Sequence, residues 1–315
     1  MGTVYEVERV SDGRHFAAKV LSVKPSYLAM ARFAREAQLL ARLQHPNLIA
    51  IVDVDISTDR LAYLVMEQVD GQSLEELHAR YGERELMLSV LFQVAEALAA
   101  VHAAGVVHRD LKPGNVLIAF DANGLRATAK LVDFGISRLL EAEEGAAEPA
   151  PRPVSREARA ADLSTRREDV TLPSSRGGRT AEQLTQAGSL MGTLFYMAPE
   201  LRDGADLAQP PADVFSFGLM AYEVLTGVAP FETPALLLAA GPQGQLALKP
   251  LLETCPGLGA GLAGLLERCL AVDPGARPSP VELAAALRES SAQGKVVLTG
   301  DRAKSLRTNV DQLVD

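Results

Sequence analysis

The chain has 315 residues, a formal net charge of −9 and a hydrophobic fraction of 48%, which allows one large or two medium globular domains with an ample core. The net negative charge argues against a surface that binds nucleic acid. The sequence contains no run of eighteen apolar residues and no N-terminal signal sequence, so no membrane span is predicted. The two cysteines, Cys255 and Cys269, are too far apart for a CxxC pair and indicate a reducing compartment. These features predict a cytoplasmic protein.

Two strands are predicted at the start of the chain, Val4 to Val10 and His15 to Val20. The second strand carries Lys19, and a strand lysine taken alone is usually a surface residue that favours solubility. From Tyr27 to Gln44, apolar residues recur at helical spacing. This pattern predicts a helix with Glu36 on the face beside the apolar stripe.

The helix is predicted to end before Pro46, because the residue that precedes a proline leaves the α region. Two further strands, Ile49 to Ile56 and Leu61 to Val69, come next, and Leu86 to Ala103 is predicted as a long apolar helix. His102 lies on this helix. A lone histidine on an apolar helix is interpreted as a core or boundary residue without a chemical role.

A hairpin is predicted where two short apolar runs, Val116 to Phe120 and Ala127 to Val132, flank Asn123-Gly124. Asn-Gly is a strong hairpin signal, because both central residues of the favoured two-residue turn need φ > 0. The open ends of such a hairpin bring together carboxylate, amide and ammonium groups, those of Asp110, Lys112, Asn115 and Asp133. These groups are suited to holding a divalent metal and transferring a phosphoryl group.

The spacing of these residues is specific, since HRDLKPGN at 108–115 followed by DFG at 133–135 is the protein-kinase signature pair. The chain resembles a eukaryotic-type Ser/Thr protein kinase of the bacterial kind over nearly its whole length. The resemblance implies an α+β, bilobal fold with a small β-rich N-lobe and a larger helical C-lobe. The expected boundaries are 1–69 for the N-lobe and hinge, 70–289 for the C-lobe, and 290–315 for a tail or linker.

The resemblance also implies roles for the residues of the site. Asp110 would accept the proton of the substrate hydroxyl, Lys112 would neutralise charge on the phosphoryl group, and Asn115 and Asp133 would hold Mg²⁺ or Mn²⁺. Contacts with ATP are implied for Gly2 and Val4 of a glycine-rich loop, for Lys19 paired with Glu36, and for the backbone of Glu67 and Val69. The first strand and the two earlier glycines of that loop are missing from this sequence, so the N-lobe is expected to be clipped within the loop.

After the DFG motif the chain is rich in small and charged residues, and 141–183 is predicted as a disordered insertion in the activation segment. A neutral insertion and a regulatory loop with phosphorylation sites are both compatible with this composition. The segment closes at APE, 198–200. By resemblance, Thr185 is a candidate activating phosphorylation site, Arg109 could pair with its phosphate, and Thr193 belongs to the Ser/Thr-kinase pattern.

Three further residues are expected to support the site rather than to react, by the same resemblance. Asp213 would accept backbone N–H groups of the catalytic loop, and Arg277 would pair with Glu200. The expected partners are ATP and protein substrates, with a homodimer for autophosphorylation. Two alternatives stay open, a pseudokinase or binding module of the same fold and a small-molecule phosphotransferase.

Overall fold

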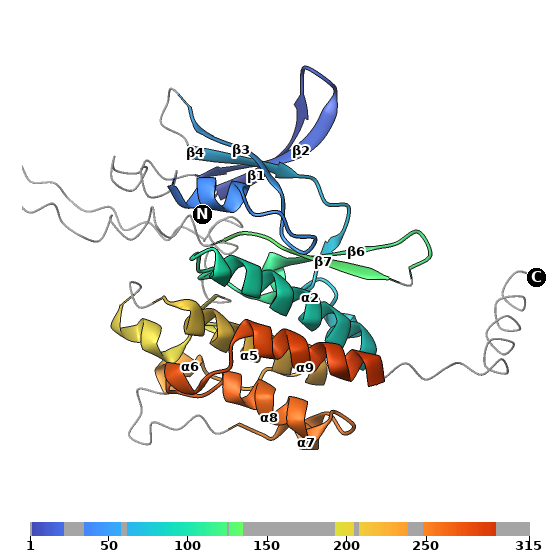
Figure 1. The fold of residues 1–315 in the computed structure, drawn as a ribbon, viewed down its shortest axis with the longest axis vertical. Helices are drawn as coiled ribbons and strands as arrows, with labels where there is room; N and C mark the ends of the chain where they lie inside the picture. Colours follow the sequence, from blue (N-terminus) through green and yellow to red (C-terminus); the bar gives the residue numbers. More distant parts are fainter. Residues whose placement is uncertain are drawn as a thin grey trace, which may run out of the picture.

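The computed structural model describes residues 2–21, 35–57, 62–124, 126–134, 193–204, 208–238 and 248–293. The predictions for the insertion at 141–183, for Thr185 and for most of the tail at 290–315 lie outside these residues. The described part forms a small lobe built on a sheet and a larger lobe of helices (Figure 1).

The small lobe is a four-stranded antiparallel sheet with strand order β1-β2-β4-β3. Its strands are β1 (Gly2–Arg9), β2 (Arg14–Leu21), β3 (Ile51–Ile56) and β4 (Ala62–Glu67). Side chains alternate between the two faces, and β4 therefore buries Ala62, Leu64 and Met66. The predicted strands are confirmed, and residues 35–41 of the predicted helix are helical.

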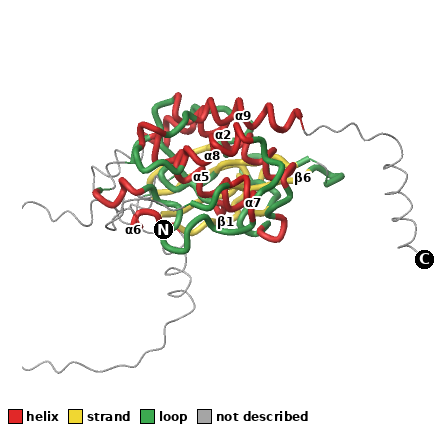
Figure 2. The backbone as a smooth tube through the Cα atoms, turned by 90° about the horizontal axis from the view of Figure 1, so that it is seen from below, coloured by secondary structure: helices red, strands yellow, loops and turns green. Residues whose placement is uncertain are grey.

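The larger lobe contains α2 (Arg84–Ala103), α5 (Pro210–Thr226), α6 (Ala235–Leu238), α7 (Leu251–Thr254), α8 (Ala260–Cys269) and α9 (Pro280–Gln293). Single 3₁₀ turns occur at η1 (His78–Arg80), η2 (Pro113–Asn115), η3 (Pro199–Asp203) and η5 (Pro274–Ala276). Helix α2 packs against α9, α5 and strand β7 (Ala127–Leu131). Seen from below, α2, α5, α8 and α9 lie together over the strands (Figure 2).

Local sequence signals determine where helices α5 and α9 of the larger lobe begin or end. Helix α5 begins with proline at its first position and ends at Gly227, whose φ of 77° is the left-handed conformation that favours glycine. Helix α9 begins with a capping box, in which Ser279 and Glu282 exchange hydrogen bonds of 2.7 and 3.2 Å between side chain and backbone. The capping box of α9 satisfies an N–H group that the first turn leaves without a helical partner, and Gly227 donates its N–H to the carbonyl oxygen of Glu223 in the last turn of α5.

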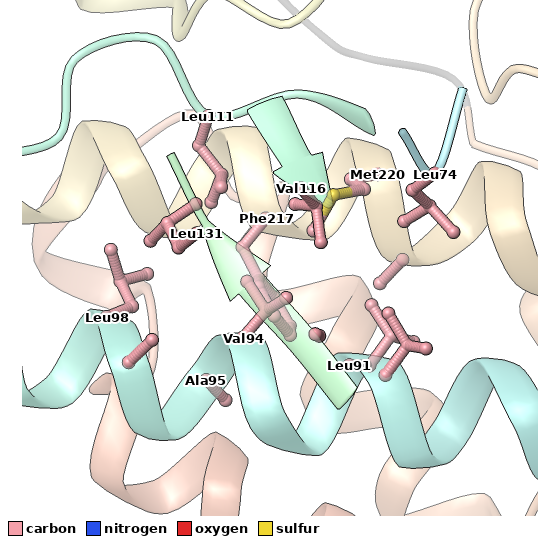
Figure 3. Packing of buried hydrophobic residues seen from close by; sticks show 14 of the residues in the cluster. Leu74, Leu91, Val94, Ala95, Leu98, Leu111, Val116, Leu131, Phe217 and Met220 are labelled. Carbon is pink, nitrogen blue, oxygen red and sulfur yellow. The ribbon is translucent and has the colours of Figure 1, made fainter. Parts of the chain in front are cut away.

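The core of the larger lobe forms where α2, α5 and the β6–β7 hairpin meet (Figure 3). Leu91, Val94 and Leu98 of α2 face Leu131 of β7 and Phe217 of α5, and all five side chains are buried. By length and composition, α2 is also the one helix of the described residues that could cross a membrane. In this fold its apolar residues instead build the core, since it packs against helices and a strand.

The predicted hairpin is present as β6 (Val116–Phe120) and β7, paired antiparallel with Val116 opposite Leu131. A second short pairing adds β5 (Gln72–Ser73) to β6. The connection, residues 121–126, is longer than the two-residue turn in which Asn-Gly is most favoured. Gly124 has a φ of +66°, Asn123 does not have a positive φ, and the loop is closed by hydrogen bonds from Gly124 N to Asp121 O and from Asp121 N to Arg126 O. Among the described residues of this loop, only Gly124 is left-handed.

Candidate active site

The HRD segment lies between α2 and β6 in the sequence, and its backbone is hydrogen-bonded to Asp213 of α5. The carboxylate of Asp213 accepts the backbone N–H groups of His108 at 2.7 Å and of Arg109 at 2.8 Å. This contact confirms the predicted supporting position of Asp213. Arg109 has a φ of +66°, a costly conformation for a residue with a side chain, which persists only where the surroundings fix it.

His102 is a member of this support that sequence reasoning missed. Its Nε2 lies 2.8 Å from a carboxylate oxygen of Asp213, and the two side chains are almost fully buried. A carboxylate oxygen only accepts hydrogen bonds, so Nε2 is the donor. The buried Nδ1 of His102 has no hydrogen-bond partner among the described residues. Helical spacing alone carries no sign of such a contact, because Asp213 is 111 residues away in the sequence.

His108 joins the HRD segment to the DFG strand. Its Nε2 lies 3.0 Å from the carbonyl oxygen of Val132, and its ring lies 4.9 Å from that of Phe134. The side chain is fully buried, and this burial lowers the pKa of His108. His108 is therefore a neutral structural link between the two motifs.

The groups predicted for catalysis converge around Asp110. The Nδ2 of Asn115 donates to the backbone oxygen of Asp110 at 2.7 Å and to its carboxylate at 2.9 Å. The Nζ of Lys112 lies 3.2 Å from the same carboxylate and 2.7 Å from the hydroxyl of Thr193. The structure thus brings together Asp110, Lys112, Asn115 and Thr193 from the catalytic loop and the end of the activation segment.

Asp133 lies next to this group, since the backbone N–H of Val132 donates to the backbone oxygen of Asn115 at 2.9 Å. Asp133 has a φ of +57°, the second strained backbone position of the site. The amide nitrogen of Asn115 faces Asp110, which leaves its side-chain oxygen for another partner. One amide oxygen and one carboxylate are donors that fit a hard divalent cation completed by phosphate or water oxygens. The described residues contain no group of three His, Cys, Asp or Glu side chains that could hold a metal by themselves.

The predicted ion pair between Lys19 and Glu36 is wrong for this conformation. Lys19 Nζ instead lies 2.8 Å from Asp133, and the guanidinium of Arg109 lies 3.1 and 3.2 Å from the two carboxylate oxygens of Glu36. Each cation is neutralised, but the partners are exchanged. The physical reason is that Asp133 offers Lys19, and Arg109 offers Glu36, an opposite charge in direct contact, so each charge is compensated without the expected pair.

The other residues expected to contact the nucleotide lie on β1, at the end of β4 and in the connection that follows it. Gly2 and Val4 are on β1, with Val4 opposite Lys19 in the pairing of β1 and β2. Glu67 ends β4, and its carboxylate accepts hydrogen bonds from Lys130 at 2.6 Å and from the backbone of Ala50 at 2.8 Å. Val69 follows in the connection to the larger lobe. The side chain of Glu67 thus ties the two lobes together.

The cavity at this site is small, about 30 Å³, and is lined by residues that include Lys19, Met66, Asp133 and Phe134. The contact between Lys19 and Asp133 closes it on one side. A much larger groove of about 890 Å³ lies between the start of α2 and the β6–β7 hairpin. This groove does not contain the residues above, and size alone gives it no chemistry.

The end of the activation segment is anchored by the predicted pair of Glu200 and Arg277. The guanidinium donates to both carboxylate oxygens, at 2.6 and 2.8 Å, which confirms the pairing. Nearby, the hydroxyl of Tyr196 donates to Glu223. Burial raises the pKa values of both side chains.

This combination of lobes and motifs defines a phosphotransferase of the protein-kinase kind. The protein kinase domain family matches residues 1–154 and 177–287. The chain belongs to this family. The residues between the two matched parts, 155–176, fall inside the segment predicted as an insertion, and 288–315 lie beyond the match.

Among curated proteins, the chain is 37% identical over 293 residues to the serine/threonine-protein kinase pkn2 of Myxococcus xanthus, which covers 91% of this chain and 30% of that protein. It is 35% identical over 250 residues to PknA of Mycobacterium tuberculosis, which covers 76% of this chain and 47% of PknA. The chain therefore spans less than half the length of these relatives. Among solved structures, the PknI kinase domain of Mycobacterium tuberculosis is similar with a TM-score of 0.59 at 26% identity, over 92% of this chain and 91% of that one.

Proposed function

We propose that this chain is a protein Ser/Thr kinase domain that transfers the γ-phosphoryl group of ATP to serine and threonine hydroxyls of proteins. One observation carries the proposal. Asp110, Lys112 and Asn115 form a group joined by contacts of 2.7 to 3.2 Å, and Asp133 lies beside it through the hydrogen bond between Val132 and Asn115.

In the proposed reaction, Asp110 accepts the hydrogen bond of a substrate hydroxyl and takes its proton as the new O–P bond forms. The bond from the γ-phosphorus to the oxygen it shares with the β-phosphate breaks, and ADP leaves. Lys112 is already 3.2 Å from Asp110, so its ammonium group is positioned to offset negative charge on the group in transit. Positioning and electrostatics supply most of the rate in this chemistry.

Asn115 and Asp133 are the proposed ligands of Mg²⁺ or Mn²⁺, through the amide oxygen and the carboxylate. A bound cation would neutralise phosphate charge. Lys19 is proposed to contact phosphate oxygens, and this requires its 2.8 Å contact with Asp133 to open. Four residues complete the nucleotide site in this proposal: Gly2 and Val4 beside the phosphates and the base, and Glu67 and Val69 with backbone groups for adenine.

We assign regulation to Arg109, which the structure pairs with Glu36. A phosphate on Thr185 would compete for Arg109, because a guanidinium binds a dianionic phosphate at least as well as a carboxylate. Glu36 would then be released toward Lys19. Dephosphorylation should lower activity in the parent chain and leave Thr185→Ala unaffected, and activity in Thr185→Ala equal to that of the phosphorylated parent would exclude this site.

Autophosphorylation is proposed to occur between two copies of the chain in the cytoplasm. Thr193, whose hydroxyl accepts a hydrogen bond from Lys112, is proposed to lie beside the acceptor residue. The proposed organisation keeps the N-lobe and hinge at 1–69, the C-lobe at 70–289 and a tail or linker at 290–315. The pair formed by Glu200 and Arg277 favours a protein acceptor over a small molecule, since it anchors the platform that follows the activation segment. Within the structure, the direct contact between Lys19 and Asp133 favours a binding module, since it occupies two groups that the reaction needs.

The test is transfer of labelled γ-phosphate from MgATP to the chain itself and to myelin basic protein. Asp110→Asn should abolish the label, whereas Glu253→Gln, an exposed carboxylate on α7, should not change it. The same assay is run on a version that restores a complete glycine-rich loop. Absence of label from both versions would refute a kinase and leave the binding module, and label on aminoglycoside or choline acceptors alone would indicate a small-molecule enzyme.

A further inference from the structure

Strand β7 leads directly to Asp133, yet it is an edge strand, since the order of its sheet is β5-β6-β7. Ala127, Ala129 and Leu131 direct backbone groups away from β6. Buried backbone groups need partners, and an edge strand normally finds them in another strand or in water. Here the partners come from two carboxamide side chains and one loop.

Gln93 of α2 takes the place of a strand residue along the first half of this edge. Its Oε1 accepts the N–H of Ala129 at 2.9 Å, and its Nε2 donates to the carbonyl oxygen of Ala127 at 3.0 Å. Nε2 also donates to the backbone oxygen of Ser89, one turn back on α2, at 3.2 Å. A neutral carboxamide offers an acceptor and a donor side by side, as a backbone peptide does.

Asn47 continues the edge from the loop that precedes β3. Its Nδ2 donates to the carbonyl oxygen of Ala129 at 2.8 Å and to Oε1 of Gln93 at 2.8 Å. Its backbone oxygen accepts the N–H of Leu131 at 2.8 Å, and Ile49 donates to the oxygen of Leu131 at 3.0 Å. Asn47 is 6% exposed, whereas Gln93 is half-buried and lines the large groove beside α2. The hydrogen bonds share their members, so the network is sensitive to the loss of one of them.

The bracket formed by Asn47 and Gln93 connects β7, which leads to Asp133, with the loop that follows the helix of Glu36. Its loop follows the helix of Glu36 by a few residues, and β7 ends two residues before Asp133. We infer that Gln93 is a positioning residue of the phosphotransfer site, which acts by completing the free edge of β7 and fixing Asp133 relative to the helix of Glu36. This inference rests on the proposed kinase function.

The test uses two substitutions that separate the acceptor from the donor of the carboxamide. Gln93→Glu keeps an acceptor for Ala129 and Asn47, but its carboxylate faces the oxygens of Ala127 and Ser89 until it is protonated. Gln93→Met fills a similar volume but has neither the hydrogen-bond acceptor nor the donor of the carboxamide. Glu96→Gln, three positions along the same helix, is the control, since Glu96 makes no hydrogen bond to β7 among the described residues.

Two quantities are measured for each protein, kcat for phosphorylation of myelin basic protein and the dissociation constant of MgADP by calorimetry. For Gln93→Met we expect kcat to fall roughly ten-fold or more, the factor given by about 1.36 kcal/mol of lost transition-state stabilisation, and MgADP to bind several-fold more weakly. For Gln93→Glu, the ratio of its kcat to that of the parent should rise as the pH is lowered from about 8 to about 6. The carbonyl oxygens of Ala127 and Ser89 and the partial burial of this position disfavour a carboxylate and raise its pKa, and the protonated form regains the donor. A merely structural loss would lower kcat by the same factor at both pH values.

The inference is overturned if Gln93→Met keeps kcat and MgADP affinity within two-fold of the parent, or if the ratio for Gln93→Glu does not change with pH. Should Gln93→Met fail to fold, Gln93→Glu decides, because it retains the acceptor contacts. A parent chain that binds MgADP without transferring phosphate refutes the proposed function, and the MgADP affinities then test the positioning role separately.

Discussion

The buried ion pair between Arg277 and Glu200 allows a quantitative prediction for Arg277→Met. All five N–H groups of the guanidinium are used, two by Glu200 and the others by the backbone oxygens of Ala271, Pro211 and Val272. The side chain of Arg277 is fully buried and that of Glu200 is 18% exposed. Methionine fills much of the same volume but donates nothing.

The expected loss is large because Glu200 and three carbonyl groups are left without their partner in a site closed to water. Breaking one side of a buried ion pair costs about 3–5 kcal/mol of unfolding free energy. The guanidinium also lies 4.9 Å from the ring centre of Phe215, a contact that methionine only partly replaces. We therefore expect Arg277→Met to lose about 3–5 kcal/mol, which is a large share of the stability of an ordinary domain.

The measurement is urea unfolding at one pH, monitored by circular dichroism, for the parent and four variants: Arg277→Met, Arg277→Lys, Glu200→Met and the double variant Arg277→Met/Glu200→Met. Arg277→Lys, which keeps the charge but not the planar fork, should lose less than Arg277→Met. Glu200→Met and the double variant complete a cycle, in which the double variant should lose about 0.5–3 kcal/mol less than the sum of the single changes. A loss below about 1 kcal/mol for Arg277→Met, or additive losses in the cycle, would show that the pair does not anchor this part of the fold.

Three other predictions test the core and its titrating groups. In Gly218→Ala the added Cβ would lie 2.6 Å from the Cβ of Cys269, so unfolding free energy should fall by about 1–3 kcal/mol; a variant as stable as the parent in urea would contradict this packing. Burial raises the pKa of Cys269 to about 12, so iodoacetamide at pH 8 should label the half-buried Cys255 in the native protein and Cys269 only after denaturation, as read by mass spectrometry; equal native labelling would be the opposite result. Because the pKa of His108 is lowered in the fold, the unfolded state binds more protons below about pH 6.5, and stability should fall there by up to about 1.4 kcal/mol per pH unit; His108→Phe should lack this component, and an unchanged slope would assign it to other groups.

The sequence predicted the site well where its residues are close along the chain. HRDLKPGN and DFG flank one hairpin, so antiparallel pairing of β6 and β7 is enough to bring Asp110, Asn115 and Asp133 to one place. The prediction needed only the spacing of apolar runs and the position of Gly124. The hairpin signal did not specify the turn itself, because the length of the loop decides how many left-handed residues it requires, and of these two residues only Gly124 has a positive φ.

Contacts between distant elements could not be predicted in the same way. Glu36 and Arg109 are 73 residues apart, and the choice of partner depends on how the helix at 35–41 lies over the catalytic loop. His102 and Gln93 gave no signal either, because their partners are a side chain on another helix and the backbone of another strand. Hydrophobic periodicity reports which face of a helix is buried and carries no information on the polar partners that meet that face.

The exchanged ion pairs follow a simple electrostatic logic. Two cations, Lys19 and Arg109, share two carboxylates, those of Glu36 and Asp133. For the proposed kinase, Asp133 must be released to hold a metal, and Lys19 then needs another negative partner, which Glu36 can supply only if it leaves Arg109. An anion that binds Arg109 therefore favours both changes of partner at once. It releases Glu36, which can then pair with Lys19, and Lys19 in turn releases Asp133. The bracket on β7 keeps Asp133 and the loop after the helix of Glu36 in register while these partners change.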